Sequence, residues 1–138
     1  MKYIDHIGIA VKDLSSSVSL FEKLLDVACY KTEFVASENV TTAFFKTGET
    51  KIELLKDEKS NGVINQFIEK KGEGIHHIAF EVENIRNEIA RLKAEGFTVL
   101  NEEPKKGADN KMICFLHPKT TNGVLIELCE QIKNTGEF

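Results

Sequence analysis

The sequence predicts an α+β domain made of two βαβββ modules that share a cleft. An internal repeat carries this prediction, because the segment His77–Ile85 repeats His6–Leu14 at an offset of 71 positions. A second match supports it, since Leu125–Leu128 repeats Lys51–Leu54 at an offset of 74 positions. Strand and helix patterns also follow the same order in both halves. A sheet with one helix leaves a face uncovered, and two such sheets can close around a common cleft.

The first module is expected to span residues 2–56. Lys2–Val11 alternates between two faces with a period of two, which is the pattern of a strand. Asp13 then caps a helix whose apolar face is formed by Leu14, Val18, Phe21 and Leu25. β-Branched and aromatic residues predict three further strands, at Cys29–Phe34, Val40–Thr47 and Thr50–Leu55.

Residues 57–74 are the expected linker, with a short helix over Ser60–Lys71. The second module, residues 75–130, repeats the plan with a strand at Ile75–Val82 and a helix capped by Asn84. The remaining strands are expected at Phe97–Leu100, Lys111–Leu116 and Gly123–Glu130, around a polar loop at 101–110. Residues 131–138 are polar and expected to fray. With no other boundary visible, residues 1–138 are predicted to be a single domain.

Composition argues against several classes of protein. The net charge of −4 disfavours a nucleic-acid partner, because phosphate binding requires a basic excess. No apolar run approaches membrane-spanning length, so no membrane partner is expected. Met1–Asp5 leads directly into the first strand, which leaves no room for a signal peptide. Cys29, Cys114 and Cys129 fall in apolar patterns, and we expect reduced thiols in a cytoplasmic protein.

Each module opens with a histidine and closes with a glutamate, which gives four candidate metal ligands: His6, Glu53, His77 and Glu127. Both glutamates lie between an isoleucine and a leucine, and a buried carboxylate is costly unless it is paired or binds a metal. Two imidazoles and two carboxylates suit one divalent ion such as Co²⁺, Ni²⁺, Mn²⁺ or Zn²⁺. A lone histidine on a strand is more often a hydrogen-bonded core residue, so it is the repeat that favours a shared site.

Two neighbouring residues compete for these positions. The repeat aligns His77 with His6, so His76 is expected to point to the opposite face of the sheet. Glu130 has no counterpart in the first module at the same register, and it is therefore not a predicted ligand.

Four groups of residues occur in order along nearly the whole chain: His6–Val11, Gly74–Ala79, Glu103–Ala108, and Phe115–Lys119 followed by Gly123–Leu128. Together they resemble the vicinal oxygen chelate superfamily, also called the glyoxalase/bleomycin-resistance fold, and within it the methylmalonyl-CoA epimerase family. Each motif alone is weak, but their combination and spacing are specific.

The resemblance implies metal ligands at His6, His77 and Glu127, with glutamine or glutamate at the position of Glu53. It also implies interconversion of the (R) and (S) forms of methylmalonyl-CoA through an enolate. A CoA-thioester substrate, a homodimer, and Co²⁺ as the foremost candidate ion complete the expectation. Glu127 is the candidate base for one face of the substrate, and Glu53 is its candidate partner.

The chain departs from the family pattern at the second proton carrier. A characterised type of epimerase has an acid on the strand that matches Val40–Thr47. The nearest residue here is Thr42, which cannot act as an acid, and Glu38 lies just outside the strand. Lysines near the last strands are candidate contacts for the phosphates of coenzyme A, or simply a solvated face: Lys105, Lys106, Lys111 and Lys119.

Other functions of the same fold are alternatives. Glyoxalase I shares the fold and the metal, but it usually has an Asp-Pro-Asp-Gly turn where this chain has His117–Gly123. The arginine and asparagine expected to hold glutathione are also missing. A metal-free binding protein, such as the drug-sequestering members of the fold, lacks the full ligand set that is present here. A non-catalytic structural domain is the last alternative.

Overall fold

The first module contains all five predicted elements. Their bounds are β1 Tyr3–Ala10, α1 Leu14–Leu25, β2 Lys31–Val35, β3 Val40–Thr47 and β4 Thr50–Asp57. The Asp13 carboxylate accepts a hydrogen bond from the Ser16 amide at 2.9 Å, so it caps α1 as its sequence position predicts. The apolar stripe of α1 packs on Phe45 and Leu54, which are fully buried.

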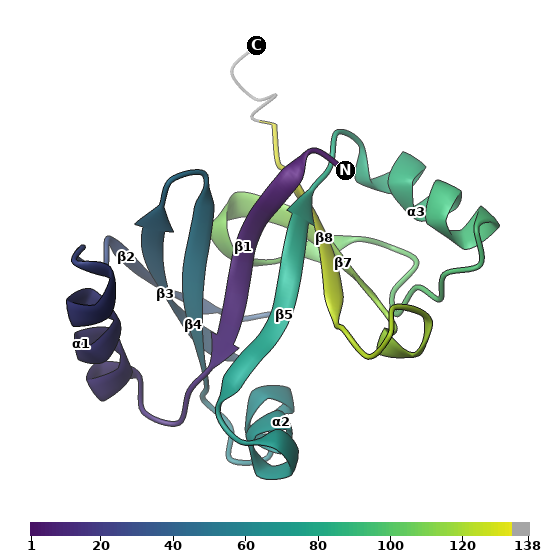
Figure 1. The fold of residues 1–138 in the computed structure, drawn as a ribbon. Helices are drawn as coiled ribbons and strands as arrows, with labels where there is room; N and C mark the ends of the chain where they lie inside the picture. Colours follow the sequence, from purple (N-terminus) through teal and green to yellow (C-terminus); the bar gives the residue numbers. More distant parts are fainter. Residues whose placement is uncertain (134–138) are drawn as a thin grey trace.

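The linker and the second module follow in the computed structural model, which describes residues 1–133 (Figure 1). Their bounds are α2 Val63–Lys71, β5 Gly74–Glu81, α3 Ile85–Ala94, β6 Lys105–Lys106, β7 Lys111–Leu116 and β8 Ile126–Gln131. The expectation of a frayed end fails at Gln131, which belongs to β8, and its part at 134–138 lies outside the described residues.

The prediction of a strand over Phe97–Leu100 was wrong. Only Val99 forms a bridge, to Leu116, and the edge strand of this module is instead the short β6. The side chain of Asn101 explains the interruption. Its Oδ1 accepts a hydrogen bond from the Phe115 amide on β7 at 3.1 Å, in place of the backbone carbonyl that a neighbouring strand would offer. Pro104 then separates this segment from β6, and it lacks the N–H that a ladder needs.

All eight strands form one curled sheet in the order β2-β3-β4-β1-β5-β8-β7-β6. The first strands of the two modules, β1 and β5, are antiparallel neighbours at its centre. Each pairs in parallel with the last strand of its own module, β1 with β4 and β5 with β8. Helices α1 and α3 lie on opposite sides of the molecule in Figure 1, while α2 lies near the start of β5. This arrangement confirms the predicted α+β fold with two βαβββ modules.

Two further expectations concern the cysteines and the absence of a membrane span. Cys114 and Cys129 are buried, Cys29 is partly buried, and none of the three forms a disulfide. Among residues 1–133, no helix is long and apolar enough to cross a membrane.

Candidate metal centre and active-site pocket

The register of the central strands brings the candidate ligands into two rows across the sheet. Glu53 on β4 lies opposite Gly8 on β1, which lies opposite His77 on β5. In the second row, His6 lies opposite Ala79 on β5, which pairs with Glu127 on β8. The residue facing each histidine is therefore very small. A Cβ on Gly8 would lie 2.3 Å from Cε1 of His77, so the ring occupies the space that a side chain would fill.

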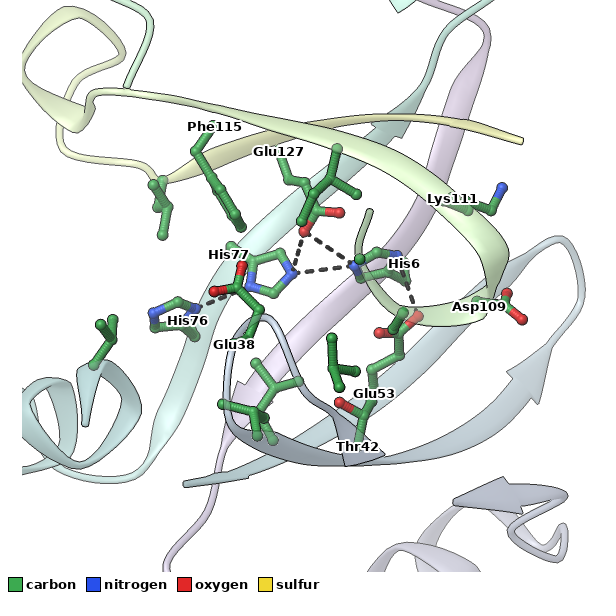
Figure 2. Close-up of a pocket in the computed structure, with 18 of the residues that line it drawn as sticks. His6, Glu38, Thr42, Glu53, His76, His77, Asp109, Lys111, Phe115 and Glu127 are labelled. Carbon is green, nitrogen blue, oxygen red and sulfur yellow. Dashed lines mark hydrogen bonds and ion pairs between the residues drawn. The ribbon is translucent and has the colours of Figure 1, made fainter. Parts of the chain in front are cut away.

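Three of the four predicted ligands converge on one point (Figure 2). Nε2 of His6 lies 3.1 Å from Nε2 of His77. Oε1 of Glu127 lies 3.0 Å from the same His77 atom and 3.5 Å from His6 Nε2. All three side chains are buried, with residue exposures of 5–6%. They come from three neighbouring strands of the two modules, so the centre exists only where the modules meet.

These separations fit a divalent cation. Bonds of about 2.1 Å place adjacent ligand atoms roughly 3.0 Å apart in an octahedral site and roughly 3.4 Å apart in a tetrahedral one. The three observed separations run from 3.0 to 3.5 Å. Two imidazole nitrogens and one carboxylate oxygen are also the donors that intermediate divalent ions prefer. The chain therefore has a residue group that can hold a metal ion.

Glu53 lies beside this group, on the other edge of the His6 ring. Its Oε2 is 3.2 Å from Nδ1 of His6, whereas Glu127 faces Nε2. Glu53 is buried, with 3% exposure, and it is not part of the group that the other three donors form. The two candidate proton carriers thus occupy opposite edges of one imidazole.

Charge is tightly coupled in the metal-free centre. Burial disfavours charge on His6, but the carboxylates of Glu127 and Glu53 outweigh it and raise the pKa of His6 to about 10. Burial likewise opposes charge on Glu127, yet His6 and His77 lower the pKa of its carboxyl to about 2. Burial dominates at Glu53 and raises the pKa of that carboxyl to about 7. His6 is therefore a cation between two acids when no metal is bound.

The prediction that His76 points to the opposite face was wrong. The pairing of β1 with β5 slips between Gly8 and Ile9, which leaves His76 as an extra residue in a β-bulge. The bulge turns His76 toward the pocket, where its Nδ1 lies 2.9 Å from Nδ1 of His77 (Figure 2). Burial, followed by the neighbouring His77, lowers the pKa of His76 to about 4, so it is neutral at physiological pH.

Sequence reasoning missed a buried charge network next to the centre. Asp5 is 2% exposed, and its Oδ2 lies 2.8 Å from Nδ1 of His6. Its Oδ1 accepts from Nζ of Lys51 at 3.0 Å and of Lys111 at 3.2 Å. Lys111 also donates to Glu81 at 2.6 Å. Strand alternation placed Asp5 on the face opposite His6, but a second register shift, between Ile4 and His6, brings both side chains inward.

The remaining sequence candidates have other surroundings. Thr42 lines the pocket and is 2% exposed. Glu38 also lines it, and its carboxylate accepts from Nζ of Lys105 at 3.0 Å. Lys111 is too deeply buried to be a surface contact for phosphate, which corrects that expectation. The excluded Glu130 instead caps α3, since its Oε1 accepts the Ile85 amide at 2.7 Å.

A cavity of about 370 Å³ opens from the centre. Its floor carries the candidate ligands, and its walls are largely apolar, with Val35, Leu55, Ile113, Phe115 and Leu125 among them. This combination of apolar walls and few convergent polar groups is typical of a small-molecule site.

Comparison with known proteins agrees with this geometry. Residues 5–115 match the Glyoxalase/Bleomycin resistance protein/Dioxygenase superfamily. The chain is 38% identical to the uncharacterized protein YqjC of Bacillus subtilis, over 94% of this chain and 93% of that one. It is 40% identical to the ethylmalonyl-CoA/methylmalonyl-CoA epimerase of Cereibacter sphaeroides, over 94% and 97%.

A solved structure is similar along nearly its whole length. Methylmalonyl-CoA epimerase in complex with methylmalonyl-CoA and NH4+ is 33% identical, with a TM-score of 0.90 over 95% of each chain. These relatives are enzymes that are similar to nearly the whole chain, so the chain is an enzyme and the predicted resemblance is confirmed. It belongs to the Glyoxalase/Bleomycin resistance protein/Dioxygenase superfamily and, within it, to the methylmalonyl-CoA epimerase family.

Proposed function

We propose that the protein is a metal-dependent methylmalonyl-CoA epimerase, which interconverts the (R) and (S) forms of its substrate through an enolate. One observation carries the proposal beyond the family assignment. It is the convergence of His6 Nε2, His77 Nε2 and Glu127 Oε1 at the floor of an apolar cavity. In this proposal these residues hold one divalent ion, Co²⁺ foremost, with Ni²⁺, Mn²⁺ and Zn²⁺ as alternatives. Glu53 is the fourth ligand.

The chemistry requires stabilised charge on oxygen and proton transfer at carbon. C2 of methylmalonyl-CoA lies between a thioester and a carboxylate, so loss of its proton places negative charge on the thioester oxygen. A bound divalent cation supplies Lewis-acid stabilisation for charge of this kind. The apolar walls exclude water and strengthen the electrostatic interactions inside the cavity.

Proton transfer is assigned to the two glutamates. Glu127 removes the C2 proton on one face of the substrate, and Glu53 returns a proton on the other face. Both carboxylates are buried beside the His6 ring and line the same cavity, which supports this assignment, because epimerisation needs two proton carriers within reach of one substrate. Thr42 has no acidic group to supply the second proton, and the Glu38 carboxylate is paired with Lys105.

The binding of the coenzyme A part of the substrate and the oligomeric state belong to the same proposal. Lys105 and Lys106 form an exposed edge strand beside the cavity, where they are suitably placed for the phosphates of coenzyme A. We expect a cytoplasmic homodimer, which analytical ultracentrifugation and cell fractionation test directly. Neither these phosphate contacts nor the dimer is needed for the proton-transfer chemistry at the metal centre.

A comparison of substrates tests the proposal. Metal-loaded protein is supplied with either (S)-methylmalonyl-CoA or the hemithioacetal of methylglyoxal and glutathione. We expect epimerisation of the first, abolished by a chelator and restored by added metal, and little conversion of the second. Faster conversion of the hemithioacetal would replace the proposal with glyoxalase I, and binding without turnover of either compound would indicate a non-enzymatic binding protein.

A further inference from the structure

Asp5 is a buried carboxylate that has no part in the function proposed above. A β-bulge places it beside His6, so two consecutive side chains of β1 face the same interior. Burial of a charged group at a site where strand alternation would leave it outside requires a specific partner. The partner of its Oδ2 is the His6 ring, whose Nδ1 lies 2.8 Å away.

The hydrogen bond fixes which nitrogen of His6 carries the proton. An ionised carboxylate can only accept, so Nδ1–H of His6 donates to Asp5. Nε2 then faces His77 and Glu127, and its lone pair is available to a cation once its own proton has left. A carboxylate on the far nitrogen of a ligand histidine also orients the ring and raises its basicity.

Two lysines keep Asp5 suited to this task. Nζ atoms of Lys51 and Lys111 both bind Oδ1, at 3.0 and 3.2 Å, which leaves Oδ2 to the histidine. They come from β4 and β7, so each module contributes one cation. Burial opposes the charge on Asp5, but His6 and the two lysines outweigh it and hold the pKa of its carboxyl well below the usual range.

Asp5 also resolves a competition for the same proton. Oε2 of Glu53 lies 3.2 Å from Nδ1 of His6, a longer contact than the one made by Asp5. Because Asp5 accepts the Nδ1 proton at the shorter distance, Glu53 is free to turn toward the ligand side of the ring. Asp5 thus orients His6, and Glu53 remains available for the role proposed for it.

We propose that Asp5 is a positioning residue that orients His6 for metal binding, and that Lys51 and Lys111 fix the side chain of Asp5 in place through its other oxygen. The inference rests on the metal site of the proposed function and adds a residue that the site depends on. It predicts that loss of the Asp5 charge weakens metal binding although Asp5 does not touch the metal.

Glu81 provides a matched control, since it is equally buried and binds the same lysine at 2.6 Å, and no hydrogen bond or ion pair joins it to His6. Zn²⁺ affinity is measured by competition calorimetry for the wild type, Asp5→Asn and Glu81→Gln. Asp5→Asn is expected to weaken binding by about 10- to 100-fold, the usual effect of losing such a partner. Glu81→Gln is expected to leave the affinity unchanged. Equal losses in the two variants would reduce Asp5 to a structural role.

Each single variant leaves the buried Lys111 with one acid in place of two, so a second pair of variants protects the test against misfolding. Asp5→Asn/Lys111→Met and Glu81→Gln/Lys111→Met each remove the cation together with the acid, and the same contrast in affinity is expected. Nitrogen-15 NMR of the Zn²⁺-loaded protein should detect a protected His6 Nδ1–H in the wild type, which is lost in Asp5→Ala and retained in Glu81→Gln. A protected Nδ1–H in Asp5→Ala would overturn the proposal.

Metal binding by the wild type distinguishes failure of this inference from failure of the proposed function. A single Zn²⁺ site that His77→Ala destroys, together with wild-type affinity in Asp5→Asn, rejects only the positioning role. Absence of any such site in the wild type rejects the metal centre, and the role of Asp5 with it.

Discussion

Replacing Gly8 with alanine should remove His77 from the metal centre without unfolding the protein. A Cβ at this position would lie 2.3 Å from Cε1 and 2.6 Å from Nδ1 of His77. Carbon atoms in contact stay about 3.5 Å apart, so the ring must move by roughly 1 Å. Metal–ligand distances tolerate only about 0.2 Å. We therefore expect metal affinity to fall at least about 100-fold, which corresponds to about 2.7 kcal/mol.

Calorimetry with Co²⁺ or Zn²⁺ measures this loss, and urea denaturation measures the accompanying strain. Overpacking of this kind costs about 1–3 kcal/mol of the free energy of unfolding. The double variant Gly8→Ala/His77→Ala is the control, because the ring that clashes is then absent and the added methyl group should be tolerated. Wild-type metal affinity in Gly8→Ala, or equal destabilisation with and without His77, would refute the assigned geometry.

Three further predictions concern the ligands themselves. His77→Ala should abolish tight metal binding, whereas His76→Ala should weaken it by less than about tenfold, because His76 contacts Nδ1 of His77 and not the Nε2 that faces the other ligands. If calorimetry gave the reverse order, His76 and not His77 would be the ligand. Glu127→Gln should retain the metal by elemental analysis but lower kcat at least about 100-fold, since an amide cannot accept the proton; near-normal turnover would make Glu127 a ligand only. Because the pKa of His6 is raised to about 10, metal binding at neutral pH must release a proton from this ring. The affinity should therefore rise with pH by up to about tenfold per unit below that pKa, and calorimetry in buffers of different ionisation enthalpy would contradict this if no proton were released.

Much of the fold is readable from local patterns in the chain. The period of two in β1 and β5 and the repeated His and Glu positions predict the module order and the meeting of His6, His77 and Glu127. Both patterns depend only on alternation and on sequence spacing, which survive in any regular sheet. The strand assigned to Phe97–Leu100 failed because one side chain, Asn101, takes the place of a backbone partner.

The surroundings of the ligands could not be predicted in the same way. Two β-bulges turn Asp5 and His76 inward, and a bulge reverses the face of a residue without a mark in the polarity pattern. Lys51 and Lys111 reach Asp5 from strands that are distant in the sequence, so their contacts depend on the curl of the finished sheet. An aspartate directly before the first histidine was the available signal.

The most direct test of the proposed chemistry is solvent exchange at C2 of the substrate. Metal-loaded protein is incubated with (R)-methylmalonyl-CoA in D₂O, and the C2 proton is followed by NMR while the enantiomers are resolved by chiral analysis. Abstraction by Glu127 and return of a proton on the other face predict that deuterium enters C2 as the (S) form appears, and that Glu127→Gln suppresses both. If the metal-loaded protein leaves both the C2 proton signal and the (R) configuration unchanged, the proposed proton transfer is contradicted.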